Sequence, residues 1–186
     1  MRIVTAIAFC TCMISGAFAA ESKSVILLVS EQNIEGPQRA WWASEVDLSA
    51  TEATISRQLI TVGYEIIDPV AVSGIIQKQQ AFRTIDMSEK TSLQLGQISK
   101  ADYIVLGKAV ASAGGNVPQS SMRSCFANLF AKVIRVKDGK TIAFLESAGH
   151  SAHMDPITGG REALKIGADD LAFKIVNVLK EDSGGK

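Results

Sequence analysis

The sequence predicts a single α/β domain in which helices pack against a mixed β-sheet. Three segments rich in Val, Ile, Phe and Ala lie between residues 101 and 148, and turn-forming residues separate them, as in a meander of three antiparallel strands. In the first half of the chain, strand-like segments alternate with segments of helical periodicity, which favours parallel strands joined by crossovers. The expected order of elements is β-α-β-α-α-β-β-β-α.

The first strand is expected at residues 24–31, because SVILLVSE is a continuous apolar run typical of a strand buried on both faces. Ser49 and Glu52 form a capping-box pattern at the start of a helix, and Gly63 is suited to end that helix in the left-handed conformation. A short strand at 64–67 is expected to follow.

Two more helices are expected before the meander. Asp68-Pro69 predicts the start of the first, since proline at the first helical position loses no hydrogen bond. The second is expected to begin at Ser88. The strands of the meander are expected at residues 102–112, 124–137 and 140–148.

The end of the chain combines turn formers with a final helix. Asp138-Gly139 is a strong hairpin signal, because glycine tolerates positive φ. Residues 149–161 contain turn formers, and an apolar stripe predicts a last helix at 162–180. The polar residues 181–186 are expected to form a disordered tail, which leaves one domain at 20–180.

Residues 1–19 have the features of a secretory signal peptide. A basic residue precedes an uncharged apolar run, and Ala17-Phe18-Ala19 has small residues where signal peptidase reads them. The run is too short to span a bilayer as a helix. We therefore expect a periplasmic protein that is exported through a cleavable signal peptide, with association with the outer membrane left open. Two alternatives stay open, an uncleaved membrane anchor and a lipoprotein acylated at Cys10 or Cys12.

Composition narrows the class of partner. The chain has 19 Lys and Arg against 19 Asp and Glu, so net charge gives no reason to expect nucleic acid or anionic lipid as a ligand. Cys125 is the one cysteine after the expected signal peptide. We therefore expect no intrachain disulfide and a buried thiol, with an intermolecular disulfide or a reactive thiol as the other reading.

Two segments carry a resemblance to a known family. Residues 95–107 (LGQISKADYIVLG) and 127–144 (ANLFAKVIRVKDGKTIAF) resemble a group of bacterial envelope proteins. The group contains the curli-secretion channel lipoprotein, the outer-membrane lipoprotein activator of penicillin-binding proteins and the middle domain of flagellar assembly protein T. The resemblance implies a periplasmic α/β domain that binds other envelope proteins. A pore is not expected, because residues 32–46 and 113–123 are too short and too polar for membrane-crossing hairpins.

Residues with catalytic potential do not form a recognised motif. The sequence has no GxSxG and no glycine-rich phosphate-binding pattern. His150 and His153, near Asp155, could share a metal only in a turn, since residues three apart in a strand point to opposite faces. We therefore expect no enzyme, no cofactor and no metal. Catalysis through Cys125 or the histidine pair is a third and minor hypothesis.

Three segments are candidate binding sites. Arg39, Trp41 and Trp42 lie in a long polar stretch, where the tryptophans either anchor a partner or cover the helix layer. Thr158 to Arg161 precede the expected last helix, whose N–H groups could hold an anion. The residues of this possible anion site are Thr158, Gly159, Gly160 and Arg161. The third candidate site is a loop that could contact a partner, and it contains Asn116, Val117, Pro118, Gln119 and Met122.

The function expected from these observations is that of an exported, non-enzymatic accessory or scaffold protein. It would bind other envelope proteins during assembly or regulation of a flagellar, secretion or peptidoglycan-synthesis machine, with a homo-oligomer left open. The alternative is a periplasmic protein that binds a small ligand or an anion.

Overall fold

The computed structural model of the chain describes residues 22–34, 36–39, 49–68 and 89–184. The expected signal peptide and the helix expected after Asp68 lie outside these residues.

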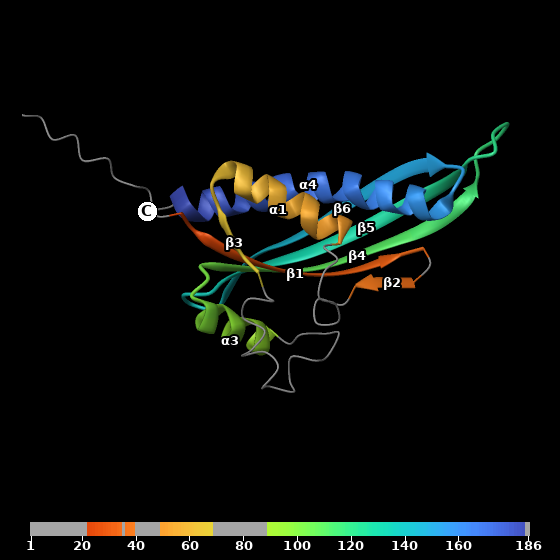
Figure 1. Cartoon of the computed structure of the whole chain (residues 1–186). Coiled ribbons are helices and arrows are strands. Elements are labelled where there is room, and N and C mark those ends of the chain that lie inside the picture. The colour runs from red at the N-terminus through yellow and green to blue at the C-terminus, as the bar shows by residue number, and fades with distance from the viewer. Residues whose placement is uncertain (1–21, 35, 40–48, 69–88, 185–186) are drawn as a thin grey trace, which may run out of the picture.

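An open sheet of six strands forms the centre of the molecule (Figure 1). The strands follow the order β2-β1-β4-β5-β6, and β3 pairs with β1. β1 is parallel to β3 and β4, and the other pairs are antiparallel. The predicted mixed α/β sheet is therefore confirmed. The bounds are β1 Ser24–Asn33, β2 Gly36–Arg39, β3 Glu65–Ile67, β4 Tyr103–Asn116, β5 Arg123–Arg135 and β6 Lys140–His153.

Within the described residues, three helices pack on this sheet from two sides. α1 (Ala50–Val62) and α4 (Pro156–Gly184) cover one face, and α3 (Glu89–Ser99) lies on the other face at one end (Figure 1). The main core therefore lies between the sheet and the pair α1 and α4.

The ends of α1 follow the local sequence signals. Ser49 is the N-cap residue, and its hydroxyl accepts a hydrogen bond from the Glu52 N–H at 3.0 Å. Gly63 ends the helix with φ at 97°. The buried Glu31 of β1 supplies a second acceptor, because its carboxylate takes the Thr51 N–H at 2.8 Å.

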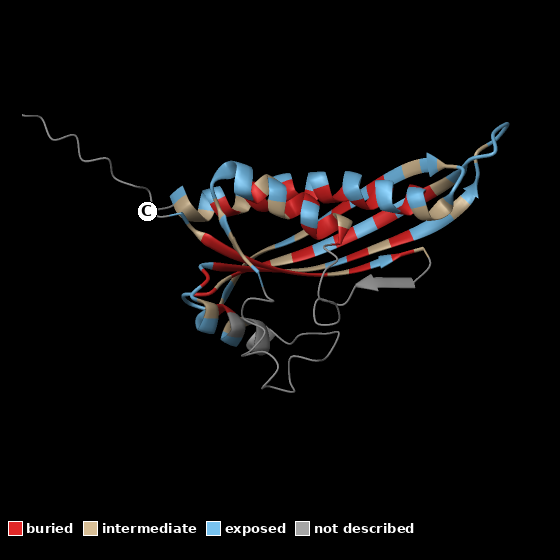
Figure 2. Ribbon diagram, in the orientation of Figure 1, coloured by how far each residue is buried: buried red, intermediate tan, exposed pale blue. Residues whose placement is uncertain are grey.

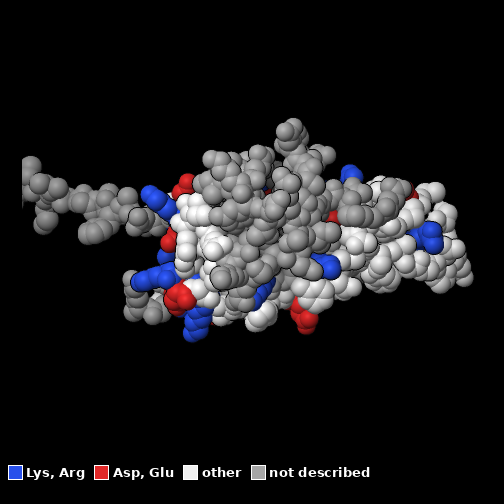
Figure 3. Space-filling model, turned by 90° about the horizontal axis from the view of Figure 1, so that it is seen from below, with Lys and Arg blue, Asp and Glu red and all other residues white. Residues whose placement is uncertain are grey.

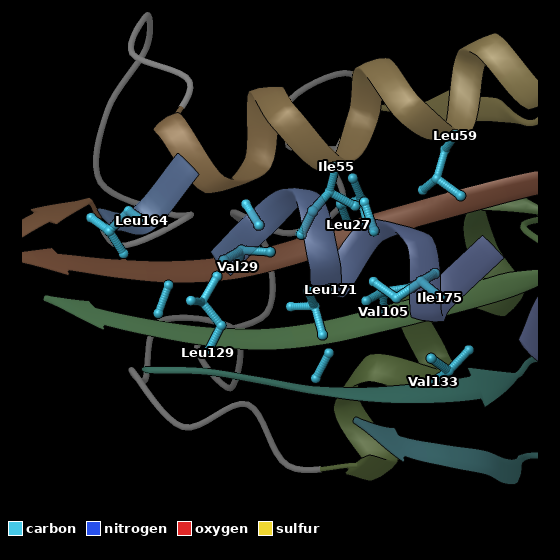
Figure 4. Close-up of a cluster of buried hydrophobic side chains, with 14 of the residues drawn as sticks. Leu27, Val29, Ile55, Leu59, Val105, Leu129, Val133, Leu164, Leu171 and Ile175 are labelled. Carbon is cyan, nitrogen blue, oxygen red and sulfur yellow. The ribbon is translucent and has the colours of Figure 1, made fainter. Parts of the chain in front are cut away.

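The main core is built from alternating residues of the strands and the apolar stripes of α1 and α4. Figure 4 shows these side chains pointing into one layer between sheet and helices, and Figure 2 shows the buried positions along the strands and helices that enclose it. Full burial of a Leu or Ile side chain contributes about 1.5–3 kcal/mol relative to exposure. Fully buried members include Leu27, Ile55, Leu59, Leu129, Leu171 and Ile175.

A smaller apolar cluster lies on the opposite face beneath α3. It contains Ile26, Leu28, Ala101, Ile104 and Val136. A Cβ atom on Gly96 of α3 would lie 2.6 Å from the side chain of Ile104 and 2.7 Å from that of Val136. The glycine therefore lets α3 approach the sheet closely at this end.

The boundary between β6 and α4 differs from the expectation. Residues 149–161 are not an irregular turn: β6 continues to His153 and α4 begins at Pro156. The small residues of this segment are packing residues. Ser147 and Ser151 donate hydrogen bonds to the Gly167 and Gly159 carbonyls of α4, each at 2.6 Å.

The expected tail is also largely helical, because α4 continues to Gly184. Asp182 holds this end of the helix against the sheet: it accepts a hydrogen bond from Tyr103 Oη at 2.9 Å and pairs with Arg135 at 2.5 Å. The Lys23 ammonium donates to Ser183 Oγ at 2.8 Å. The two ends of the described chain therefore meet.

Two loops are shorter than expected. β2 occupies part of the stretch expected to be a loop at 32–46, and it pairs with the end of β1. β4 runs to Asn116 instead of ending at 112, because its last residues still pair with β5 across a register shift. The β4–β5 hairpin is therefore long and has a short tip.

Candidate interaction surface

The face of the sheet opposite α4 carries exposed aromatic side chains. In β5, Cys125, Ala127 and Leu129 point toward α4 and are buried. Phe126 and Phe130 alternate with them and point to the other face, as the period of two in a strand requires. Figure 2 shows this alternation of buried and exposed positions along the strands.

Three phenylalanines on this face remain open to solvent. Phe126, Phe130 and Phe144 keep 48%, 53% and 76% of their surface exposed. Large apolar side chains gathered on one surface are typical of binding sites rather than of an ordinary solvated face. We define the phenylalanine face as these three residues together with Lys108 and Glu146.

Charged side chains flank the aromatic rings in register. Phe130 lies between Lys108 of β4 and Glu146 of β6, which are its direct cross-strand neighbours and are both exposed. The Lys132 ammonium lies 5.3 Å from the centre of the Phe144 ring, close enough for a cation–π interaction. Figure 3 views this side of the molecule and shows, toward the hairpin end, separated charged side chains among mostly uncharged atoms.

The phenylalanine face has defined limits. α3 and the apolar cluster beneath it occupy the sheet at one end. Toward the other end, the Phe126 ring packs on Gly114 of β4, where a Cβ would lie 2.6 Å from a ring carbon. The glycine therefore provides the space in which this ring lies.

The tip of the β4–β5 hairpin is the predicted loop site. Its turn is held by a hydrogen bond from Val117 N–H to the Met122 carbonyl at 2.9 Å, and Ser120 Oγ accepts the Met122 N–H at 2.9 Å. Gln119 has φ at 57°, and Met122 is exposed. Figure 1 places this tip at the end of the molecule opposite the C-terminus.

The predicted tryptophan site is described only in part. Arg39 is the last residue of β2, where its backbone pairs with Glu31 of β1. Trp41 and Trp42 lie outside the described residues, so the role expected for them stays a prediction.

The segment expected to bind an anion lies inside the first two turns of α4. Gly159 and Gly160 are buried there, packed against Cys125 and Asn33. The Asp155 carboxylate accepts hydrogen bonds from Thr158 N–H at 2.9 Å and from Ile157 N–H at 3.3 Å. The hydrogen bonds from Thr158 hold the pKa of Asp155 below its usual value. A carboxylate of the chain itself thus stands where an external anion would bind.

The two histidines do not converge. His150 lies on the phenylalanine face as the cross-strand neighbour of Phe126. His153, three positions on, shares hydrogen bonds with the backbone of Asp155 at the start of α4. Within the residues that the structure describes, no group of three or more His, Cys, Asp or Glu side chains could hold a metal ion.

Cys125 is buried, as the sequence predicts for a structural thiol. Its side chain is fully covered and lies 3.6 Å from the Pro156 carbonyl. Burial raises the pKa of the thiol, which disfavours the nucleophilic thiolate.

The sequence patterns described above do not predict the phenylalanine face. The alternation of Phe126 and Phe130 with small residues could have shown that they share one face of a strand. It could not show which face α4 covers, because that depends on a helix about thirty residues further along the chain.

No described helix of this chain combines the length and the apolar character that a membrane crossing requires. No protein-family model matches the sequence, and no curated protein matches it either.

Solved structures resemble the chain only distantly. A hypothetical protein from Chlamydia trachomatis has a TM-score of 0.46 and 13% identity, over 86% of this chain and 96% of that one. A lipoprotein from Neisseria meningitidis has a TM-score of 0.45 and 10% sequence identity, over 89% of this chain and 99% of that one. The C-terminal domain of LpoB from Salmonella enterica has a TM-score of 0.41 and 14% sequence identity, over 68% of this chain and 82% of that one. These likenesses are too weak to assign a function.

Proposed function

We propose that this chain is an exported, non-enzymatic accessory protein that binds other proteins of the cell envelope. The phenylalanine face carries the proposal. Aromatic side chains are costly to leave in water, and they supply much of the binding free energy when a partner covers them.

The position of the reactive groups supports a binding role over catalysis. The Cys125 thiol is covered by α4, and its hydrogen-bond partners are backbone carbonyls. His150 and His153 are directed to different surroundings. A nucleophile with an adjacent base, which acyl transfer or thiol chemistry requires, is not formed by these residues.

The shape of the molecule offers a second contact surface. Lys23 and Ser183 bring the two ends of the described chain together at one end of the molecule. The hairpin tip at residues 117–122 lies at the other end (Figure 1). A partner can therefore reach the tip and the phenylalanine face without disturbing the packed ends of the chain.

Quantitative crosslinking in the native envelope tests this proposal. Wild type, Phe130→Ser and the control Phe173→Ser are compared, since Phe173 is 61% exposed on α4, on the other side of the sheet. We expect a reproducible set of envelope proteins to be captured by wild type and by the control. Phe130→Ser should reduce that capture by about tenfold, as loss of a hot-spot aromatic does.

Equal capture by Phe130→Ser and Phe173→Ser would remove the phenylalanine face from the proposal. Failure of wild type to capture any envelope protein reproducibly would contradict the proposed function itself.

A further inference from the structure

We infer that the phenylalanine face binds one amphipathic α-helix of a partner protein, lying along β5. The helix has an apolar stripe over Phe126 and Phe130, acidic residues on the flank above Lys108 and basic residues on the flank above Glu146. This inference rests on the proposed function and specifies the partner's chemistry.

The spacing of the flanking charges matches the width of a helix. Lys108 and Glu146 lie on β4 and β6, with β5 between them. Neighbouring strands are about 4.8 Å apart, so the two backbones are about 10 Å apart. A helix with its side chains is about 10–12 Å wide. A helix lying along β5 would therefore contact the rings and be flanked by one charge on each side.

The length of the aromatic row also suits a helix. Phe126 and Phe130 are four residues apart on β5, which corresponds to about 14 Å along the strand. A helix rises about 1.5 Å per residue, so about nine residues cover this distance. Two or three apolar residues at helical spacing would then lie over the two rings.

The sheet already accepts a helix on this same face. α3 packs beside the phenylalanine face, and Gly96 permits its close approach to Ile104 and Val136. Among the described helices, only α3 lies on this face, so the phenylalanine face continues a surface whose other end is covered by a helix. A partner helix would complete the layer that α3 begins.

A second copy of this chain fits the face less well. Consider two copies related by a two-fold axis and packed with their phenylalanine faces together. Lys108 of one copy then meets Glu146 of the other only when the strands of both sheets run in the same direction. Both α3 helices would then lie at the same end, in a space of about 10 Å between the sheets. That space holds one helix and not two.

The test uses helical peptides as probes with the folded protein. Two labelled peptides of about 15 residues share one leucine stripe. The mixed-flank peptide has Glu on one side of the stripe and Lys on the other, and the acidic-flank peptide has Glu on both sides. Fluorescence anisotropy gives the affinity of each peptide for wild type, Phe130→Ser, Glu146→Lys and the control Ile166→Ser on α4.

We expect wild type and Ile166→Ser to bind the mixed-flank peptide about fivefold more tightly than the acidic-flank peptide. The reason is that the mixed-flank peptide places Lys next to Glu146, where the acidic-flank peptide places Glu, a like charge. Glu146→Lys should reverse this preference, because both flanks of its face are then basic. Phe130→Ser should weaken both peptides by about tenfold. Circular dichroism checks that each variant is folded.

Absence of saturable binding by wild type would overturn the inference, as would binding that Phe130→Ser leaves unchanged. A photoreactive group at position 130 that crosslinks only to the chain itself would also overturn it, because the face would then be occupied internally.

The outcomes separate this inference from the proposed function. If envelope capture depends on Phe130 but neither peptide binds, the helix is wrong and the function stands. If the mixed-flank peptide binds as expected but wild type captures no envelope protein, the proposed function is wrong, while the preference of the face for a helix is supported.

Discussion

At Gly149 the backbone of α4 comes into direct contact with β6. A Cβ at this position would overlap the Ala163 carbonyl and would lie 2.7 Å from the Gly167 nitrogen. Both are backbone atoms, so neither can move away without shifting the helix. The residue therefore fixes how closely the main helix approaches the edge of the sheet.

Gly149→Ala should destabilise the protein by about 3 kcal/mol, in the upper range for overpacking a tight site. Urea denaturation gives the free energy of unfolding. Gly115→Ala is the matched control, because a Cβ there meets nothing within 4 Å, and its effect should stay within about 0.5 kcal/mol. Equal stability of the two variants would show that α4 can move to accommodate the methyl group.

The turn between β5 and β6 contains an ion pair with a defined pH dependence. Hydrogen bonds from Arg135 lower the pKa of Asp138 to about 2. A carboxyl group whose pKa is lower in the folded than in the unfolded protein stabilises the fold at a pH above its unfolded-state pKa. This stabilisation is lost as the pH falls from about 4 toward 2. The thermal midpoints of wild type and Asp138→Asn should therefore differ at pH 6 and converge as the pH approaches 2. A constant difference would mean that the ionised carboxylate is not the cause.

At the scale of elements, the sequence predicts the ends of helices and the turns wherever the contacts that form them lie between neighbours in the chain. Ser49, Gly63 and Gly139 were predicted from neighbours in sequence, and the structure places them at the two ends of α1 and in the β5–β6 turn. The β6–α4 boundary was not predictable in this way. Ser151 and Gly159 are common in turns, and their packing role depends on contact between two elements that the sequence pattern cannot pair.

The end of α4 is a second element whose role depends on distant residues. Asp182 bonds to Tyr103 of β4 and Arg135 of β5, so it joins the helix to two strands. Asp182→Ala should cost about 2 kcal/mol of unfolding free energy, as expected for hydrogen bonds to a partly buried charge. Glu181→Ala, at an exposed position, should change it by less than about 0.5 kcal/mol. Similar effects of both substitutions would indicate that the end of α4 is frayed.

At the scale of the whole molecule, the described helices cover one face of the sheet along its length and the other face only at one end. This asymmetry could not be predicted, because the sequence shows which residues alternate but not where the helices settle. Sequence patterns therefore place the candidate sites in loops, whereas the phenylalanine face lies on regular strands.

The exposed phenylalanines should contribute to binding and not to folding. Phe130→Ser and Phe144→Ser should each leave the free energy of unfolding within about 0.5 kcal/mol of wild type, since exposed positions contribute little. The double variant should bind less of a dye such as 1-anilinonaphthalene-8-sulfonate in its folded state. A large loss of stability would instead show that the rings pack against the chain itself.

The contact between Lys23 and Ser183, near the two ends of the described chain, has a consequence for engineering. A short linker could join them, and new termini could be opened within residues 117–122 without breaking a strand. Such a circular permutant would keep every strand pairing of the sheet while cutting the hairpin tip. It would separate the contribution of an intact tip from that of the sheet in a single molecule.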